Sequence, residues 1–134
     1  MVKNDLTHKD LTVYSFESVE KFHVWLSKNY TREQGFWLRL YKKATGKPTV
    51  QISEAVDEAL CYGWIDGLIN GYDEESYLIR FTPRRPKSVW SKINVAKVEK
   101  LIKDGRVQPS GQKHINAAKL DGRWAAAYSS GKEK

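Results

Sequence analysis

The stretch EALCYGWIDGLINGYDEESYLIRFTPRRPKSVWSKIN, residues 58–94, contains the clearest local signals for the fold. Residues 64–69 and 76–82 have the pattern of two strands, and the turn between them holds Asn-Gly and acidic residues, so we expect a β-hairpin. Pro83 and Pro86 cannot continue the hydrogen-bonding ladder of a strand. The segment TPRRPKS around them is therefore expected to be a surface loop.

Residue spacing on both sides of this stretch predicts helices and one more strand. Four segments have the apolar spacing of a helix, at about 18–29, 53–63, 95–105 and 109–122. The sequence GFWLRLYKK alternates strictly, which predicts a half-buried strand at about 35–42. The first dozen residues have the pattern of an arm or a short edge strand. The prediction is an α+β fold, with about four helices packed on a small antiparallel sheet of about three strands.

Length and composition are typical of one folded domain. The chain has 134 residues, of which 40% are hydrophobic, so we expect a single domain over 1–134, with 1–14 as a loose N-terminal arm and 129–134 as a frayed tail. Cys61 is the only cysteine and no Cys/His cluster accompanies it, so neither a disulfide, a metal site nor a cofactor is expected. No secretion signal or membrane-spanning stretch is recognisable, which favours the cytoplasm.

The charge is distributed in blocks. The net charge is +7, yet no Lys, Arg or His occurs between Gln51 and Ile79. The segment from Arg80 to Lys103 is strongly basic, with Glu99 as its single acid. Either the two blocks neutralise each other within the fold, or the basic block forms an anion-binding surface.

Three arginines and nearby aromatic residues form the main candidate site. Arg80, Arg84 and Arg85 lie close in sequence to Trp64 and Trp90. Guanidinium groups bind carboxylate or phosphate in a bidentate manner, and aromatic rings stack on bases. This mixture favours a nucleotide, a sugar phosphate or a single-stranded nucleic acid as ligand. The alternative is that the arginines pair with acidic residues and hold the loop in place.

Asp66 and Cys61 are weaker candidates for chemistry. Asp66 stands in a predicted strand, where aspartate is disfavoured, so we expect it to cap a turn, to orient an arginine such as Arg80 or, less readily, to act as a general base. Cys61 has no local signature of a nucleophile, and packing is the simpler interpretation. No second carboxylate stands at a spacing that would form an acid/base pair, and no phosphate-binding glycine loop is present.

Several blocks of the chain resemble the YdeI/OmpD-associated family, also called OmdA or bacteriocin-protection proteins. The blocks are EALCYGWIDG, RFTPRRPKSVWSKIN, LIKDGR and AAKLDGRW, and the resemblance covers about residues 15–128. It implies a YjbR/CyaY-like α+β fold and a role in envelope stress or protection from bacteriocins. Together with the arginine cluster, it gives these candidate ligand-binding residues: Trp64, Asp66, Arg80, Thr82, Arg84, Arg85, Trp90, Ser91 and Asn94.

Three functions are compatible with this sequence. The first hypothesis is a cytoplasmic protein that binds an anionic small molecule or nucleic acid through the arginine-rich surface, with Asp66 and Asn94 orienting the ligand. The second is a protein–protein interaction module in stress or bacteriocin protection. The third is an enzyme that acts on a phosphorylated small molecule. We predict no catalytic residue.

Overall fold

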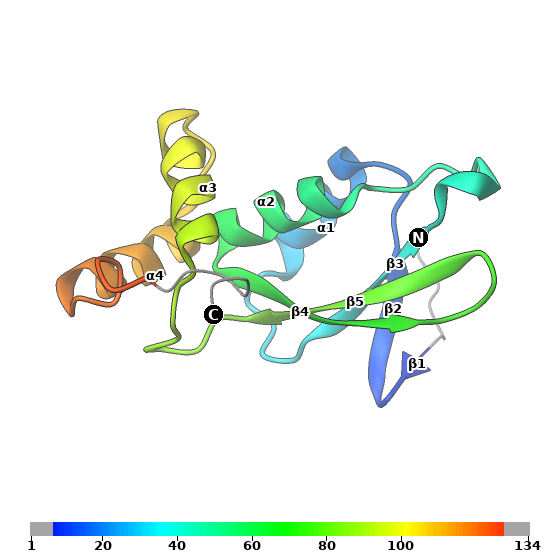
Figure 1. Ribbon diagram of the computed structural model, residues 1–134, viewed down its shortest axis with the longest axis horizontal. Coiled ribbons are helices and arrows are strands. Elements are labelled where there is room, and N and C mark those ends of the chain that lie inside the picture. Colours follow the sequence, from blue (N-terminus) through cyan, green and yellow to red (C-terminus); the bar gives the residue numbers. More distant parts are fainter. Residues whose placement is uncertain (1–6, 128–134) are drawn as a thin grey trace.

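The computed structural model of the protein describes residues 7–127, which form one mixed sheet with helices on one face and at one end (Figure 1). The strands are β1 (Thr7–His8), β2 (Leu11–Ser15), β3 (Phe36–Tyr41), β4 (Trp64–Gly71) and β5 (Ser76–Pro83). The helices are α1 (Val19–Asn29), α2 (Ile52–Tyr62), α3 (Lys92–Lys103) and α4 (Pro109–Leu120), with the short 3-10 helix η1 (Lys43–Thr45) after β3. The strand order across the sheet is β1-β2-β3-β5-β4.

The prediction of a YjbR/CyaY-like antiparallel sheet with about three strands is wrong. The sheet has five strands, and β2 pairs with β3 in parallel while the other neighbours are antiparallel. Both extra strands come from residues 7–15, where the sequence left open an arm or a short edge strand. A parallel pair needs a long connection, here α1, so no turn signal marks it in the sequence. The α+β class stands.

The ends of the predicted arm and tail, residues 1–6 and 129–134, lie outside the described residues.

The hairpin of β1 and β2 folds across the face of the sheet that α1 and α2 leave open. Its turn residues Lys9 and Asp10 both have positive φ (48° and 67°), as a tight two-residue hairpin turn requires. The indole N–H of Trp37 donates to the carbonyl of His8 at 2.9 Å, and the imidazole stands edge-on to the indole at 5.0 Å. His8 also lies 3.1 Å from the side chain of Asn70 on the opposite edge strand. The hairpin thus covers Trp37, which is buried.

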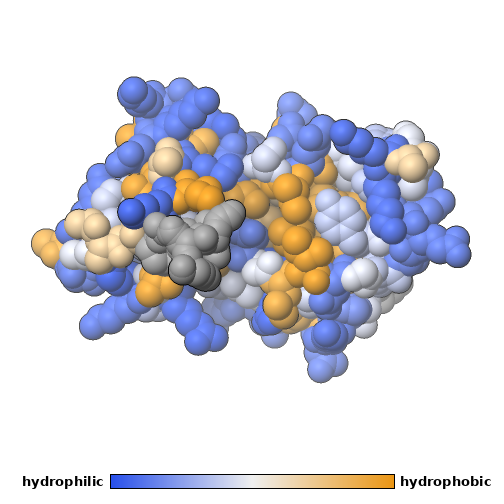
Figure 2. Space-filling view, viewed as in Figure 1, coloured by the Kyte–Doolittle hydropathy of each residue, from blue (hydrophilic) through white to orange (hydrophobic). Residues whose placement is uncertain are grey.

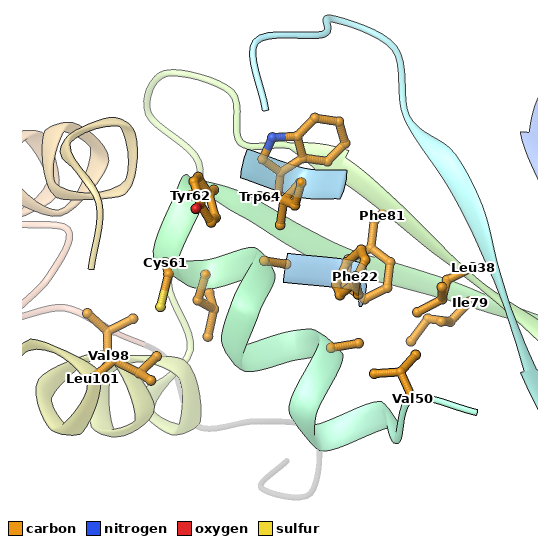
Figure 3. Packing of buried hydrophobic residues seen from close by; sticks show 14 of the residues in the cluster. Phe22, Leu38, Val50, Cys61, Tyr62, Trp64, Ile79, Phe81, Val98 and Leu101 are labelled. Atoms are coloured by element: carbon orange, nitrogen blue, oxygen red, sulfur yellow. The ribbon is translucent and has the colours of Figure 1, made fainter. Parts of the chain in front are cut away.

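The hydrophobic core lies between the other face of the sheet and helices α1 and α2. Alternate residues of β3 and β5, including Leu38, Ile79 and Phe81, are buried there together with Phe22 of α1. Figure 3 shows these four side chains gathered beside α2. Burying each such side chain contributes about 1.5–3 kcal/mol, so this layer is the main source of stability.

Helices α3 and α4 pack at the end of α2, beyond one end of the sheet (Figure 1). The backbone N–H of Gln108 donates to the carbonyl of Cys61 at 2.9 Å, and the hydroxyl of Ser110 donates to the carbonyl of Tyr62, also at 2.9 Å. Gly111 touches the Cys61 carbonyl so closely that a Cβ atom has no room. The last carbonyls of α2 are therefore satisfied by the start of α4.

Two kinds of feature do not occur within residues 7–127. No helix there combines the length and hydrophobicity that a membrane crossing needs. Nor do three or more His, Cys, Asp or Glu side chains cluster there as metal ligands.

Candidate anion-binding site

The structure buries four of the predicted ligand-binding residues. Trp64 and Trp90 are 1% and 2% exposed, and Arg84 and Ser91 are 5% and 8% exposed. The indole N–H of Trp64 donates to the carbonyl of Tyr30 at 3.1 Å, which fixes the end of α1 against β4. Trp64, Trp90 and Ser91 do not line the hollow described below, and Arg84 reaches its lining from a buried position.

Arg84 organises the loop that also carries Arg85, which we call the arginine loop (residues 82–88). Its guanidinium carbon lies 3.6 Å from the centre of the Trp90 ring. One terminal nitrogen donates to the hydroxyl of Ser88 at 2.7 Å and to the carbonyl of Val89 at 3.3 Å. Burial, reinforced by the charge of Arg84, lowers the pKa of His114 on α4. The side chain of Arg84 therefore holds the loop against the residues that lead into α3.

Ser91 and Asn94 have a structural place in α3. The hydroxyl of Ser91 accepts a hydrogen bond from the backbone N–H of Asn94 at 3.1 Å, which caps the helix.

The remaining arginines meet at a surface hollow of about 600 Å3, which we call the arginine hollow. Its lining residues are Leu11, Tyr30, Thr31, Arg32, Glu33, Gln34, Gly35, Arg80, Thr82, Pro83, Arg84, Arg85 and Pro86. The predicted residues Arg80, Thr82, Arg84 and Arg85 are therefore brought together. The segment from Tyr30 to Gly35, which connects α1 to β3, forms the opposite wall and was not predicted.

This opposite wall adds a further arginine to the hollow. Arg32 donates to the hydroxyl of Tyr14 at 3.0 Å, and its guanidinium lies 5.8 Å from the Tyr14 ring centre and 5.7 Å from that of Trp25. Glu33 is the only acidic residue of the lining. The hollow is thus strongly cationic.

Gly35 allows the two walls to approach each other. A Cβ atom at this position would lie 2.6 Å from the carbonyl oxygen of Phe81 and 2.7 Å from the methyl group of Thr82. Only glycine fits at that distance, so the start of β3 lies directly against the end of β5. Gly35, at the start of the predicted strand 35–42, was the one sequence signal for this wall, but a glycine does not identify the partner strand.

The acidic block is neutralised mainly by cations from outside the arginine loop. The ion pairs are Asp57–Lys97 (3.4 Å), Glu58–Arg106 (2.8 Å), Asp73–Arg39 (2.8 Å) and Glu75–Lys47 (2.6 Å). Among the ion pairs formed within the described part of the chain, none involves Arg32, Arg80 or Arg85. The acidic block therefore leaves the positive charge of the hollow in place.

Asp66 and Arg80 are not brought together. Asp66 is paired in register with Phe81, whereas Arg80 is paired with Trp37, so the two side chains lie on opposite faces of the sheet. The N–H at Nε of Arg80 is buried and has no hydrogen-bond partner within residues 7–127. Asp66 thus stands apart from the hollow.

Cys61 is buried, and its thiol is not activated as a nucleophile. Burial raises the pKa of its thiol to about 11, so the sulfur stays protonated at neutral pH.

One turn before Cys61 on α2, the buried carboxylate of Glu58 bridges His23 at 2.7 Å and Arg106 at 2.8 Å. This network joins α1 and the segment after α3 to α2, and it was not predicted.

Fold and hollow together define an α+β protein with a cationic surface site. The chain belongs to the family described as a domain of unknown function, DUF8412, which matches residues 14–114. The match includes both walls of the arginine hollow apart from Leu11. Neither the curated proteins nor the solved structures contain a match to this chain.

Proposed function

We propose that this protein binds an anionic ligand or a nucleic acid in the arginine hollow. One observation supports this most directly: besides the buried Arg84, three arginines and a single acid line a concave surface, and none of Arg32, Arg80 and Arg85 forms an ion pair within residues 7–127. Guanidinium groups that are not engaged by carboxylates are suited to phosphate or carboxylate ligands.

In this proposal the arginines have two roles, since some support the loop and others bind the ligand. Arg85 is exposed and follows the buried Arg84, so one member of the pair holds the loop and the other faces the ligand. Pro83 and Pro86 stiffen the chain on both sides of Arg85, which lowers the entropy lost when the ligand is bound. Arg80 and Arg32 supply further donors along the hollow.

Calorimetric titration with inorganic triphosphate at low salt tests the proposal. We expect Arg80→Gln and Arg85→Gln each to weaken binding about ten-fold or more, because each removes a charge-assisted hydrogen bond. Lys43→Gln is the matched control, since it removes an exposed positive charge in η1, outside the hollow. Binding should also fall steeply as salt rises. Equal affinities for the wild type and both arginine variants would refute the proposal.

The second candidate function is the protein–protein interaction module. Leu68 and Ile69 of the edge strand β4 are 61% and 59% exposed, although both are large and apolar. Figure 2 shows apolar residues gathered in the middle of this view of the molecule. Salt-independent capture of a partner that Leu68→Ser abolishes and Arg85→Gln leaves intact would favour this function over anion binding.

We also propose that the protein is related to the YdeI/OmpD-associated family and that it resides in the cytoplasm. The kinship is supported by the four sequence blocks, which include the end of α2, the start of β4, the arginine loop and parts of the helices after it. Alignment of many DUF8412 sequences with that family tests it, and an arginine loop without counterpart would count against kinship. Cell fractionation tests the location, and recovery outside the cytoplasm would contradict it.

A further inference from the structure

We propose that the arginine hollow is a site for a single nucleotide, in which the ring of Tyr30 stacks on the base and Arg80 and Arg85 hold the phosphates. This inference deepens the proposed function and rests on it. The observation behind it is that the lining of the hollow contains an exposed aromatic ring, that of Tyr30, as well as the arginines.

Tyr30 is a firmly placed and accessible ring. It follows the last residue of α1, lines the hollow and is 38% exposed. Its carbonyl accepts the indole N–H of Trp64 at 3.1 Å, and its ring packs on that of Tyr62 with centres 5.4 Å apart and planes tilted by 35°. Because both the backbone and the ring are supported by buried residues, the ring is already ordered before a base stacks on it.

The polar lining matches the rest of a nucleotide. Arg85 is exposed and Arg80 is half-buried, both line the hollow, and neither forms an ion pair within residues 7–127, so their guanidinium groups have donors available to phosphate oxygens. Arg32 is held by Tyr14 and adds positive charge at the other wall. Glu33, the only acid of the lining, is an acceptor suited to ribose hydroxyls.

The size and the number of aromatic residues favour one nucleotide over a strand. A volume of about 600 Å3 lies within the usual range of small-molecule sites. Binding of a single strand relies on several successive aromatic platforms along a groove. Tyr30 is the only aromatic residue in the lining of this hollow, so the hollow offers a platform for one base. A sugar phosphate would bind the arginines, but its non-planar ring would cover less of the Tyr30 ring than a flat base does.

The test compares adenosine triphosphate with inorganic triphosphate in parallel titrations of three proteins. We expect the wild type to bind adenosine triphosphate more tightly than inorganic triphosphate. Tyr30→Leu should lose this preference, with a loss of roughly 5- to 100-fold in affinity for the nucleotide and none for inorganic triphosphate. Tyr30→Phe should retain the preference because it keeps the ring. Thermal unfolding of both variants serves as a check that each is folded.

The outcomes separate this inference from the proposed function. If both ligands bind equally and Tyr30→Leu changes neither affinity, the nucleotide inference fails and anion binding in the hollow stands. If neither ligand binds to the wild type, both fail. If an oligothymidine strand binds far more tightly than the nucleotide at the same arginines, the single-nucleotide site is overturned in favour of a strand-binding surface.

Discussion

Gly35→Ala is the sharpest test of the geometry that forms the hollow. The added methyl group would lie 2.6 Å from a backbone oxygen of β5 and 2.7 Å from the methyl group of Thr82. Carbon atoms do not approach a backbone oxygen this closely, so β3 and β5 would have to move apart at their paired ends. Overpacking of this kind costs about 1–3 kcal/mol. Separation of the walls should also weaken triphosphate binding in the hollow.

Urea unfolding, followed by far-UV circular dichroism, measures this cost. Gly71→Ala in β4 is the matched control, because a Cβ atom there meets nothing within 4 Å and the backbone needs no positive φ. Loss of glycine's freedom in the unfolded chain should leave that variant equal to the wild type or more stable by up to about 1 kcal/mol. A free energy of unfolding for Gly35→Ala within about 0.5 kcal/mol of that of Gly71→Ala would refute the close approach of the two strands.

Three further predictions concern buried groups. Arg84→Lys should lower the free energy of unfolding by about 1–3 kcal/mol, because lysine cannot both stack on Trp90 and keep the loop's hydrogen bonds, whereas Arg85→Lys should leave it unchanged. Equal stability of these two variants in urea would contradict the buried position of Arg84. The raised pKa of Cys61, about 11 against 9.0, means that the unfolded chain loses its thiol proton first as pH rises. The contribution of this thiol to the free energy of unfolding is fully present below pH 9 and falls by roughly 2 kcal/mol as the pH approaches 11. The free energy of unfolding should therefore decrease less steeply with pH in Cys61→Ala. Parallel slopes would show that the thiol is not buried. Glu58→Gln should cost about 1 kcal/mol, since its ion-pair partners are partly exposed, while Glu99→Gln on the exposed face of α3 should cost nothing measurable by thermal unfolding. A Glu58→Gln variant as stable as Glu99→Gln would exclude a structural role for the network.

Local signals were sufficient to predict most elements of the fold. The hairpin of β4 and β5, the strand β3 and the four helices have patterns that repeat within a few residues, and turns or glycines mark their ends. The parallel pairing of β2 with β3 has no such mark, because it depends on how α1 returns the chain across the sheet. The sequence therefore predicted the class but not the sheet.

The candidate site could be predicted only in part. The proline-flanked arginine pair was recognised as unusual, but nothing in the sequence shows that Arg84 faces inward and Arg85 outward. Trp90 was expected at the surface and is buried, because it packs on Trp124 from a distant part of the chain. Tyr30 and Arg32 were missed, since they reach the hollow only through the pairing of β3 with β5.

The contact between His8 and Asn70 has a consequence for folding kinetics. It joins the two edge strands of the sheet across 62 residues of chain. Closing a loop of this length costs about 4 kcal/mol of chain entropy, so we expect the contact to form after the hairpin of β4 and β5 and the central strands have assembled. Substitutions of His8 should then leave the folding rate nearly unchanged and accelerate unfolding. β1 would in this way determine the lifetime of the native state more than the rate at which the native state forms.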